Sequence, residues 1–225
     1  MRALGIALVA ALAIAAATAA GAGATNECHG IQRCIQVAGP WVVVPAHSTS
    51  EYLLTCPQGV VGGLDAQVTS RAVHVSFDGR LGAPVGPGTT TTRYAFFRAV
   101  SSSPETEAFQ PRLGCVPTQG GGGRSTVSAR VSPPGPSLEY RARIVVIGPS
   151  QVKFARVGCE PNETLVGGWH AIAFRTKEPP SLRHVSLVQA THRIAGKRVV
   201  ATATSTDALS VDVHAIVQVG AECGP

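Results

Sequence analysis

The histidines of this chain are its most conspicuous titratable side chains, and two of them occupy matching places in the two halves. His74 and His184 are each followed by a Val-Ser dipeptide. Imidazole is a common ligand of transition metals, but one imidazole in each half is too few for a site without further ligands. We therefore predict that both are half-exposed strand histidines, and we expect no metal site and no cofactor.

Known catalytic motifs are missing from the sequence. It contains no Gly-x-Ser-x-Gly, no His-Glu-x-x-His, no phosphate-binding loop and no dinucleotide fingerprint. The carboxylates do not recur at matching places in the two halves, so a glycosidase-like acid pair would require residues far apart in the sequence. We predict no catalytic residue. The alternative is a secreted hydrolase whose site lies between the halves.

The first 24 residues have the composition of a secretory signal peptide. One positive charge at Arg2 is followed by an apolar, alanine-rich run and then by small residues. Ala22-Gly23-Ala24 fits the cleavage rule and places Thr25 at the mature N-terminus, although cleavage after Ala20 is also allowed. A retained membrane anchor is the competing interpretation, but we expect no membrane span after cleavage. The predicted location is secreted, extracellular or at the cell surface.

A motif that occurs twice organises the remainder of the chain. Residues 56–63 read Cys-Pro-Gln-Gly-Val-Val-Gly-Gly, and residues 159–168 read Cys-Glu-Pro-Asn-Glu-Thr-Leu-Val-Gly-Gly. Each copy is followed by a second cysteine, at Cys115 and Cys223. The sequence thus predicts a tandem repeat with a first module at 25–117, a Gly/Ser/Pro-rich linker at 118–136 and a second module at 137–225.

The apolar pattern of both copies favours β-strands. Trp41–Val44 is a β-branched run that is typical of a buried strand, and residues 144–147 lie opposite it in the second copy. Residues 73–77 and 183–187 are predicted to be matching strands. Alternation near the end of the chain places Val217, Val219 and Cys223 on one face and polar residues such as Gln218 on the other. The predicted fold is all-β, with two tandem disulfide-closed antiparallel β-sandwich modules after the signal peptide.

The cysteines are predicted to form disulfides. There are six, an even number in an exported chain, and the nearest two have five residues between them, which is a poor spacing for zinc. Strand alternation turns Cys159 and Cys223 toward one core, repeat symmetry then pairs the equivalent cysteines of the first copy, and the remaining two close a local loop. The predicted disulfides are Cys28 with Cys34, Cys56 with Cys115, and Cys159 with Cys223.

Two further features limit the possible functions. The Gly62-Gly63 and Gly167-Gly168 pairs are expected to form a bulge or a close backbone approach, since no phosphate-binding sequence follows them. The net charge is +6, but the basic residues are scattered singly and are not interleaved with aromatics. We therefore expect no binding to nucleic acid.

The arrangement of a strand that ends in cysteine, a Pro-x-Gly-like turn, Val-Gly-Gly and a closing cysteine resembles uncharacterised secreted repeat modules of actinobacteria. The resemblance covers residues 41–117 and 144–225, and the second copy departs from it by inserting Glu160 between the cysteine and the proline. It implies a disulfide-closed β-sandwich module and supplies no catalytic residues.

The features that the copies share serve the fold and not a reaction. We therefore predict a secreted non-catalytic binding or structural module that acts at the cell surface or in the extracellular matrix. Two linked copies would also raise the apparent affinity for a repetitive ligand. The expected partner is a cell-envelope polymer or a surface protein.

The leader leads to a first prediction. The exported protein should begin at Thr25 or within a few residues of it, because the signal peptidase cuts after small-x-small sequences. Intact-mass spectrometry of secreted protein measures this start directly. Secreted material that retains the leader would contradict the prediction.

Overall fold

The computed structural model describes residues 27–29, 34–78, 93–116, 138–210 and 212–225. The expected signal peptide and linker lie outside these residues. The described chain is almost entirely β-strand, which confirms the all-β class. Its one helix is α1 (Leu182–Ser186), and no helix in the described chain is long and apolar enough to cross a membrane.

The first half of the chain contributes two sets of strands. β7 lies between β2 and β4, with β1 also paired to β7, and β6 lies between β3 and β5. All these pairs are antiparallel. The bounds are β1 (Ile35–Ala38), β2 (Trp41–Val44), β3 (Thr49–Thr55), β4 (Val60–Val68), β5 (Val73–Asp78), β6 (Tyr94–Ser101) and β7 (Glu107–Val116).

The second half has the same strand order. β13 lies between β8 and β10, and β12 lies between β9 and β11, again with antiparallel pairing. The division into two separate modules stays a prediction, although each set of strands has its counterpart in the other half. The bounds are β8 (Glu139–Ile147), β9 (Val152–Gly158), β10 (Thr164–Phe174), β11 (Val188–Ala195), β12 (Arg198–Ser205) and β13 (Ala215–Gly224).

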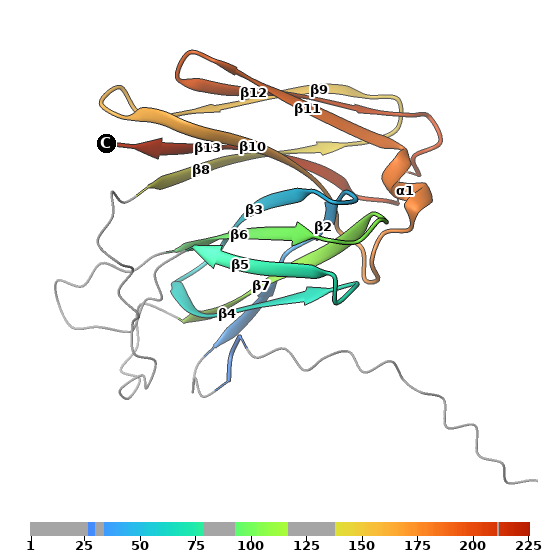
Figure 1. Cartoon of the computed structure of the whole chain (residues 1–225), viewed down its shortest axis with the longest axis horizontal. Coiled ribbons are helices and arrows are strands. Elements are labelled where there is room, and N and C mark those ends of the chain that lie inside the picture. The colour runs from blue at the N-terminus through green and yellow to red at the C-terminus, as the bar shows by residue number, and fades with distance from the viewer. Residues whose placement is uncertain (1–26, 30–33, 79–92, 117–137, 211) are drawn as a thin grey trace, which may run out of the picture.

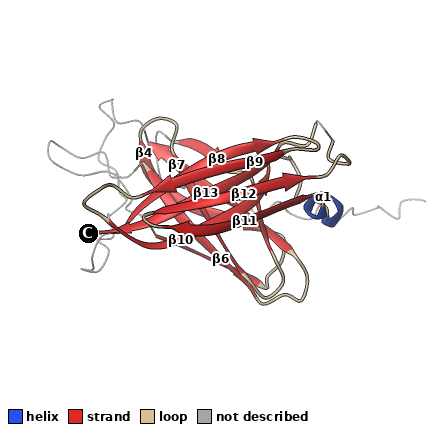
Figure 2. Cartoon of the chain, turned by 90° about the horizontal axis from the view of Figure 1, so that it is seen from above, coloured by secondary structure: helices blue, strands red, loops and turns tan. Residues whose placement is uncertain are grey.

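The halves share one sheet. β2 pairs with β10 at Val42–Ala173 and Trp41–Phe174, so the large sheet runs β1-β7-β2-β10-β13-β8, with β4 on the free side of β7. In Figure 1 the strands lie in successive layers, with β9, β12 and β11 at the top, then β8, β13 and β10, then β3, β6 and β5, and finally β7 and β4. Figure 2 shows β9, β12 and β11 from above, lying over β8, β13 and β10, with α1 at one end.

Strand β13 is buried on both faces. Val217, Val219 and Cys223 pack against the layer of β9, β12 and β11, as strand alternation predicted. Ile216, on the opposite face, packs into the core of the first half. Trp41 and Trp169 are also buried, and each is at most 3 % exposed.

Gln218 is the polar exception on this inner strand, and the sequence pattern had placed it on a polar face. Its side chain is 1 % exposed. The amide nitrogen donates to the carbonyl of Leu53 at 2.9 Å, and the amide oxygen accepts from the N–H of Leu53 at 2.7 Å. Leu53 lies on the edge strand β3, where its N–H and C=O would otherwise lack a partner. The Gln218 side chain bonds to both of them.

All six cysteines are paired, and the pairs are those predicted: Cys28–Cys34, Cys56–Cys115 and Cys159–Cys223. The second and third disulfides each tie the residue directly after β3 or β9 to the next-to-last residue of β7 or β13. In the chain-entropy account, a bond that spans 64 positions, as Cys159–Cys223 does, stabilises by about 4 kcal/mol.

The glycine pairs lie beside bulges, as expected, but the two copies are offset by one residue. The register shifts between Val61 and Gly63 in β4, and between Leu165 and Gly167 in β10. Gly63 is therefore the counterpart of Gly167. A Cβ on Gly63 would collide with the backbone carbonyl of Glu27, whereas one on Gly167 would meet the carboxylate of Glu222. Gly63 therefore needs to be glycine, because backbone fills its side-chain space, whereas at Gly167 the flexible side chain of Glu222 would have to shift.

The predicted strand at residues 183–187 is wrong. This segment contains α1, and the counterpart of β5 is β11, which begins at Val188. Pro179 and Pro180 precede the helix, and the Ser181 side chain accepts a hydrogen bond from the backbone N–H of His184, as a helix N-cap does. The cap overrides the resemblance to residues 73–77, so His184 is not a strand histidine.

The contact of Gln218 gives a stability prediction. Gln218→Met keeps the length of the side chain but leaves the N–H and C=O of Leu53 unpaired in a buried place. The expected loss is about 2–5 kcal/mol of unfolding free energy, since each buried group left without a partner costs roughly 1–3 kcal/mol. Chemical denaturation measures the loss, with Gln58→Met in the exposed turn as the control. Equal stability of both variants would show that the contact is dispensable.

Candidate binding face and the polar clusters

The layer of β9, β12 and β11 has an inner and an outer face. Ala155, Val199 and Ala201 point inward and are at most 4 % exposed. The residues of opposite parity therefore point outward. Strand pairing arranges them in rows across the three strands, and we call them the outer face: Val152, Thr204 and Gln189; Phe154, Thr202 and Thr191; Arg156, Val200 and Arg193.

The outer face combines an apolar end with hydroxyl and basic groups. Phe154 is 70 % exposed and Val152 is 60 % exposed, which is high for large apolar side chains. Threonines lie next to Phe154 in the middle row, and Arg156 and Arg193 flank Val200 in the next. No carboxylate is among these side chains. The arrangement is suited to contacts with a partner that carries both apolar or ring surfaces and negative charge.

The matching face in the first half is covered at Leu53 and Phe96, whereas Val100 on the same face is 45 % exposed. Leu53 of β3 and Phe96 of β6 point away from their own core and pack against Tyr140 of β8 and Trp169 of β10. The rings of Phe96 and Tyr140 stack with centroids 4.2 Å apart, and the Trp169 ring meets Phe96 edge-on at 4.8 Å. A Cβ on Gly220 would overlap the Trp169 ring, so glycine is required there.

A charged cluster borders this aromatic contact between the halves. The Arg98 guanidinium lies 2.7 Å from a carboxylate oxygen of Glu51 and 3.6 Å from one of Glu222, which belongs to the other half. The Tyr140 hydroxyl donates to Asp78 at 2.9 Å. If the protein were instead a hydrolase with its site between the halves, its catalytic carboxylates would have to lie in this cluster.

Burial raises the pKa of Glu222, and the negative charge of Glu51 raises it further, whereas Arg98 opposes the shift. A carboxyl with a raised pKa is a requirement for a general acid. However, Glu51 and Glu222 both face the same guanidinium, and Asp78 already accepts a hydrogen bond from Tyr140. Two of these contacts, Arg98 with Glu222 and Tyr140 with Asp78, join the halves.

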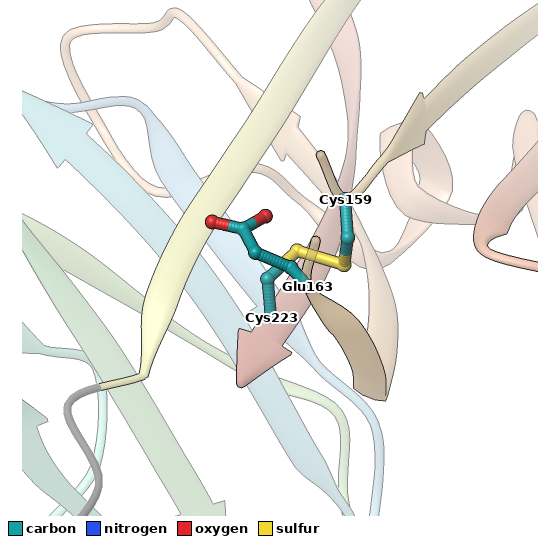
Figure 3. A group of neighbouring side chains, drawn as sticks. All are labelled: Cys159, Glu163 and Cys223. Atoms are coloured by element: carbon teal, nitrogen blue, oxygen red, sulfur yellow. A yellow bond between two sulfur atoms is a disulfide. The ribbon is translucent and has the colours of Figure 1, made fainter. Parts of the chain in front are cut away.

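A second polar group surrounds the Cys159–Cys223 disulfide, beside which the Glu163 side chain lies (Figure 3). Two cysteines and a glutamate resemble a metal site, but the sulfurs are bonded to each other and so have no thiolate to offer. The Glu163 carboxylate accepts two bonds from Arg141, at 2.6 and 3.0 Å, and one from the N–H of Glu160. The backbone N–H of Glu160, followed by Arg141, lowers the pKa of Glu163.

Of the two histidines predicted to lie in strands, His74 does and His184 does not. His74 is exposed on β5 and His184 lies in α1, so the matching motif does not place them in matching elements. Instead, His170 of β10 and His192 of β11 meet, with their Nδ1 atoms 2.7 Å apart. The sequence analysis missed this pair, because only the pairing of β10 and β11 with other strands brings together residues 22 positions apart.

Comparison of the chain with protein families, with curated proteins and with solved structures finds no match. The resemblance to secreted actinobacterial repeat modules therefore stays a prediction.

The two glutamates give opposite pH predictions. Because the pKa of Glu222 is raised by folding, its favourable contribution is present at low pH and is lost as the pH rises through the raised pKa. Glu222→Gln should therefore gain stability relative to the natural protein as the pH rises from about 4 to neutral. Unfolding free energies measured across this range test the sign.

Glu163→Gln is the matched control for that series. The pKa of Glu163 is lowered, so the natural protein should have its advantage over this variant at neutral pH and lose it as the pH falls through the lowered pKa. The same slope for both variants would contradict the assignment of the two environments.

Proposed function

We propose that the protein is exported and acts outside the cell by attachment, without turnover, and that the outer face of β9, β12 and β11 is its contact surface. The observation that carries this proposal is the exposure of Phe154 and Val152 on a sheet face whose counterpart in the first half is covered in part, at Leu53 and Phe96. Three disulfides are typical of proteins from an oxidising compartment, which supports an extracellular site of action.

The chemistry of this face favours an anionic polymer of the cell envelope as the partner. Phe154 offers a ring for stacking, and the threonines next to it offer hydroxyl donors and acceptors. Arg156 and Arg193 supply positive charge that no carboxylate of the face offsets. The net charge, +6 for the full sequence and therefore +5 without Arg2 of the leader, adds a long-range attraction to an acidic surface.

Each chain presents one such face and not two. The sequence suggested that two copies would bind together with increased apparent affinity. The contact of Leu53 and Phe96 with Tyr140 and Trp169 removes these two apolar side chains of the first half from contact with a ligand. The first half then supports the second, and attachment depends on the second half alone.

A double substitution tests the proposal. Val152→Thr with Phe154→Thr retains β-branched or hydroxyl side chains suited to a strand but removes the apolar end of the face. The variant should bind purified cell envelope at least about tenfold more weakly, because a Phe or Val side chain buried on binding is worth roughly 1.5–3 kcal/mol. Sedimentation with envelope material measures binding, and added salt should weaken it further.

Phe77→Thr is the matched control, since Phe77 is 52 % exposed on β5, far from the outer face in sequence and in a different sheet. It should bind like the natural protein. Equal binding of the double variant and the control would refute the assignment of the face. Multiple-turnover hydrolysis of a polysaccharide, peptide or ester by the intact protein would instead support the hydrolase alternative, and loss of that activity in Glu222→Gln would locate it between the halves.

A further inference from the structure

His170 and His192 lie where the two layers of the second half meet. On β10, His170 shares the side of Gly168 and Ile172, which face β12 and the core under β11. On β11, His192 has the parity of Val188 and Ala190, which point into the same core. The two rings therefore approach each other across the space between the sheets, with centroids 4.9 Å apart.

The pair is held firmly and is open to solvent. His170 is half-buried, and its backbone is paired with Val219 in the long ladder between β10 and β13. His192 is exposed and pairs with Ala201 of the central strand β12. Among the described residues, β10 pairs with β2 only at Ala173 and Phe174, so β10 is an edge at His170. An ion would reach the two rings from this edge.

The two Nδ1 atoms are 2.7 Å apart, which is the length of a hydrogen bond between the rings. Two nitrogens at about 2.0 Å from one ion lie about 2.8 Å apart at the right angle of a square-planar site, but about 3.3 Å apart at a tetrahedral angle. The rings therefore have to turn their Nδ1 lone pairs toward a common ion, but the two nitrogens need to separate less for a tetragonal site, which Cu²⁺ and Ni²⁺ prefer, than for the tetrahedral site of Zn²⁺.

We propose that His170 and His192 form a binding site for a divalent copper or nickel ion, held through both Nδ1 atoms in adjacent positions of a coordination sphere that water completes. Among the described residues, the group of three potential ligand residues lies at Cys159 and not here, so water has to supply the remaining ligands of this site. This site is separate from the outer face, because His192 points inward between the outward-facing Thr191 and Arg193.

The proton balance of binding is simple. When both rings are neutral and no ion is bound, the Nδ1–H of one ring donates to the Nδ1 of the other. To bind the ion through both Nδ1 atoms, the donor ring must carry its proton on Nε2 instead, so no net proton is released. Burial lowers the pKa of His170, and the neighbouring His192 lowers it further, which favours the neutral ring that a metal requires.

A bound ion would link β10 to β11 and thereby join the two layers of the second half. Because the link exists only in the folded chain, copper should raise the melting temperature in proportion to the logarithm of its free concentration above the dissociation constant. The shared proton already connects the rings without metal, so the effect of the ion must be measured against the metal-free protein.

The test uses untagged mature protein freed of metal by chelation and desalting. Calorimetric titration with Cu²⁺, Ni²⁺ and Zn²⁺ should show one copper per chain and tighter binding of nickel than of zinc. The electron paramagnetic resonance spectrum of the copper complex should show coupling to two imidazole nitrogens. His192→Gln and His170→Gln should each weaken copper binding at least about tenfold. The controls His29→Gln, His74→Gln and His184→Gln should leave copper binding unchanged.

His192 is exposed, so its replacement should leave the fold intact, as circular dichroism will confirm. Paramagnetic broadening of the His170 and His192 ring resonances in the natural protein gives a readout that needs no substitution. Copper binding that is unchanged when both histidines are replaced, or broadening confined to other histidines, would overturn the proposal. Zinc bound more tightly than nickel would overturn the tetragonal geometry, and no saturable copper binding at all would overturn the site.

Discussion

The arrangement of this chain depends on a strand that has no face for solvent. One side of β13 carries Val217 and Val219 under the layer of β9, β12 and β11, and the other carries Ile216 and Gln218 against the first half. Burying Gln218 is tolerable only because both ends of its amide bond to the backbone of Leu53. These two hydrogen bonds hold edge strand β3 against β13. The pairing of β2 with β10 joins the halves at a second place.

The union of the halves has a consequence for their surfaces. Leu53 of β3 and Phe96 of β6 serve the internal contact with Tyr140 and Trp169, whereas Val152 and Phe154 of β9 remain exposed. The charged cluster around Arg98 closes the border of that contact. The two halves therefore have different roles although their strand orders match. The first half supports the second, and the second carries the surface that we propose for attachment.

Local chemistry made part of this structure predictable. Alternation alone placed Cys159 and Cys223 in one core, and the β-branched run at Trp41–Val44 identified a buried strand. The pattern failed where tertiary contacts decide. Gln218 reads as a surface residue until a partner edge lies over it, and the Ser181 cap turns a strand-like segment into α1. The meeting of His170 and His192 depends on the packing of two sheets, which no short motif encodes.

Native-state hydrogen exchange tests most directly whether the halves form one structure around β13. The amides of Leu53 in the first half and of Val217 and Val219 in the second should exchange only through the same global opening, with equal opening free energies and an equal response to low concentrations of denaturant. If the Leu53 amide, whose acceptor is the side chain of Gln218, exchanges through an opening that leaves Val217 and Val219 protected, the first half opens on its own and this account is contradicted.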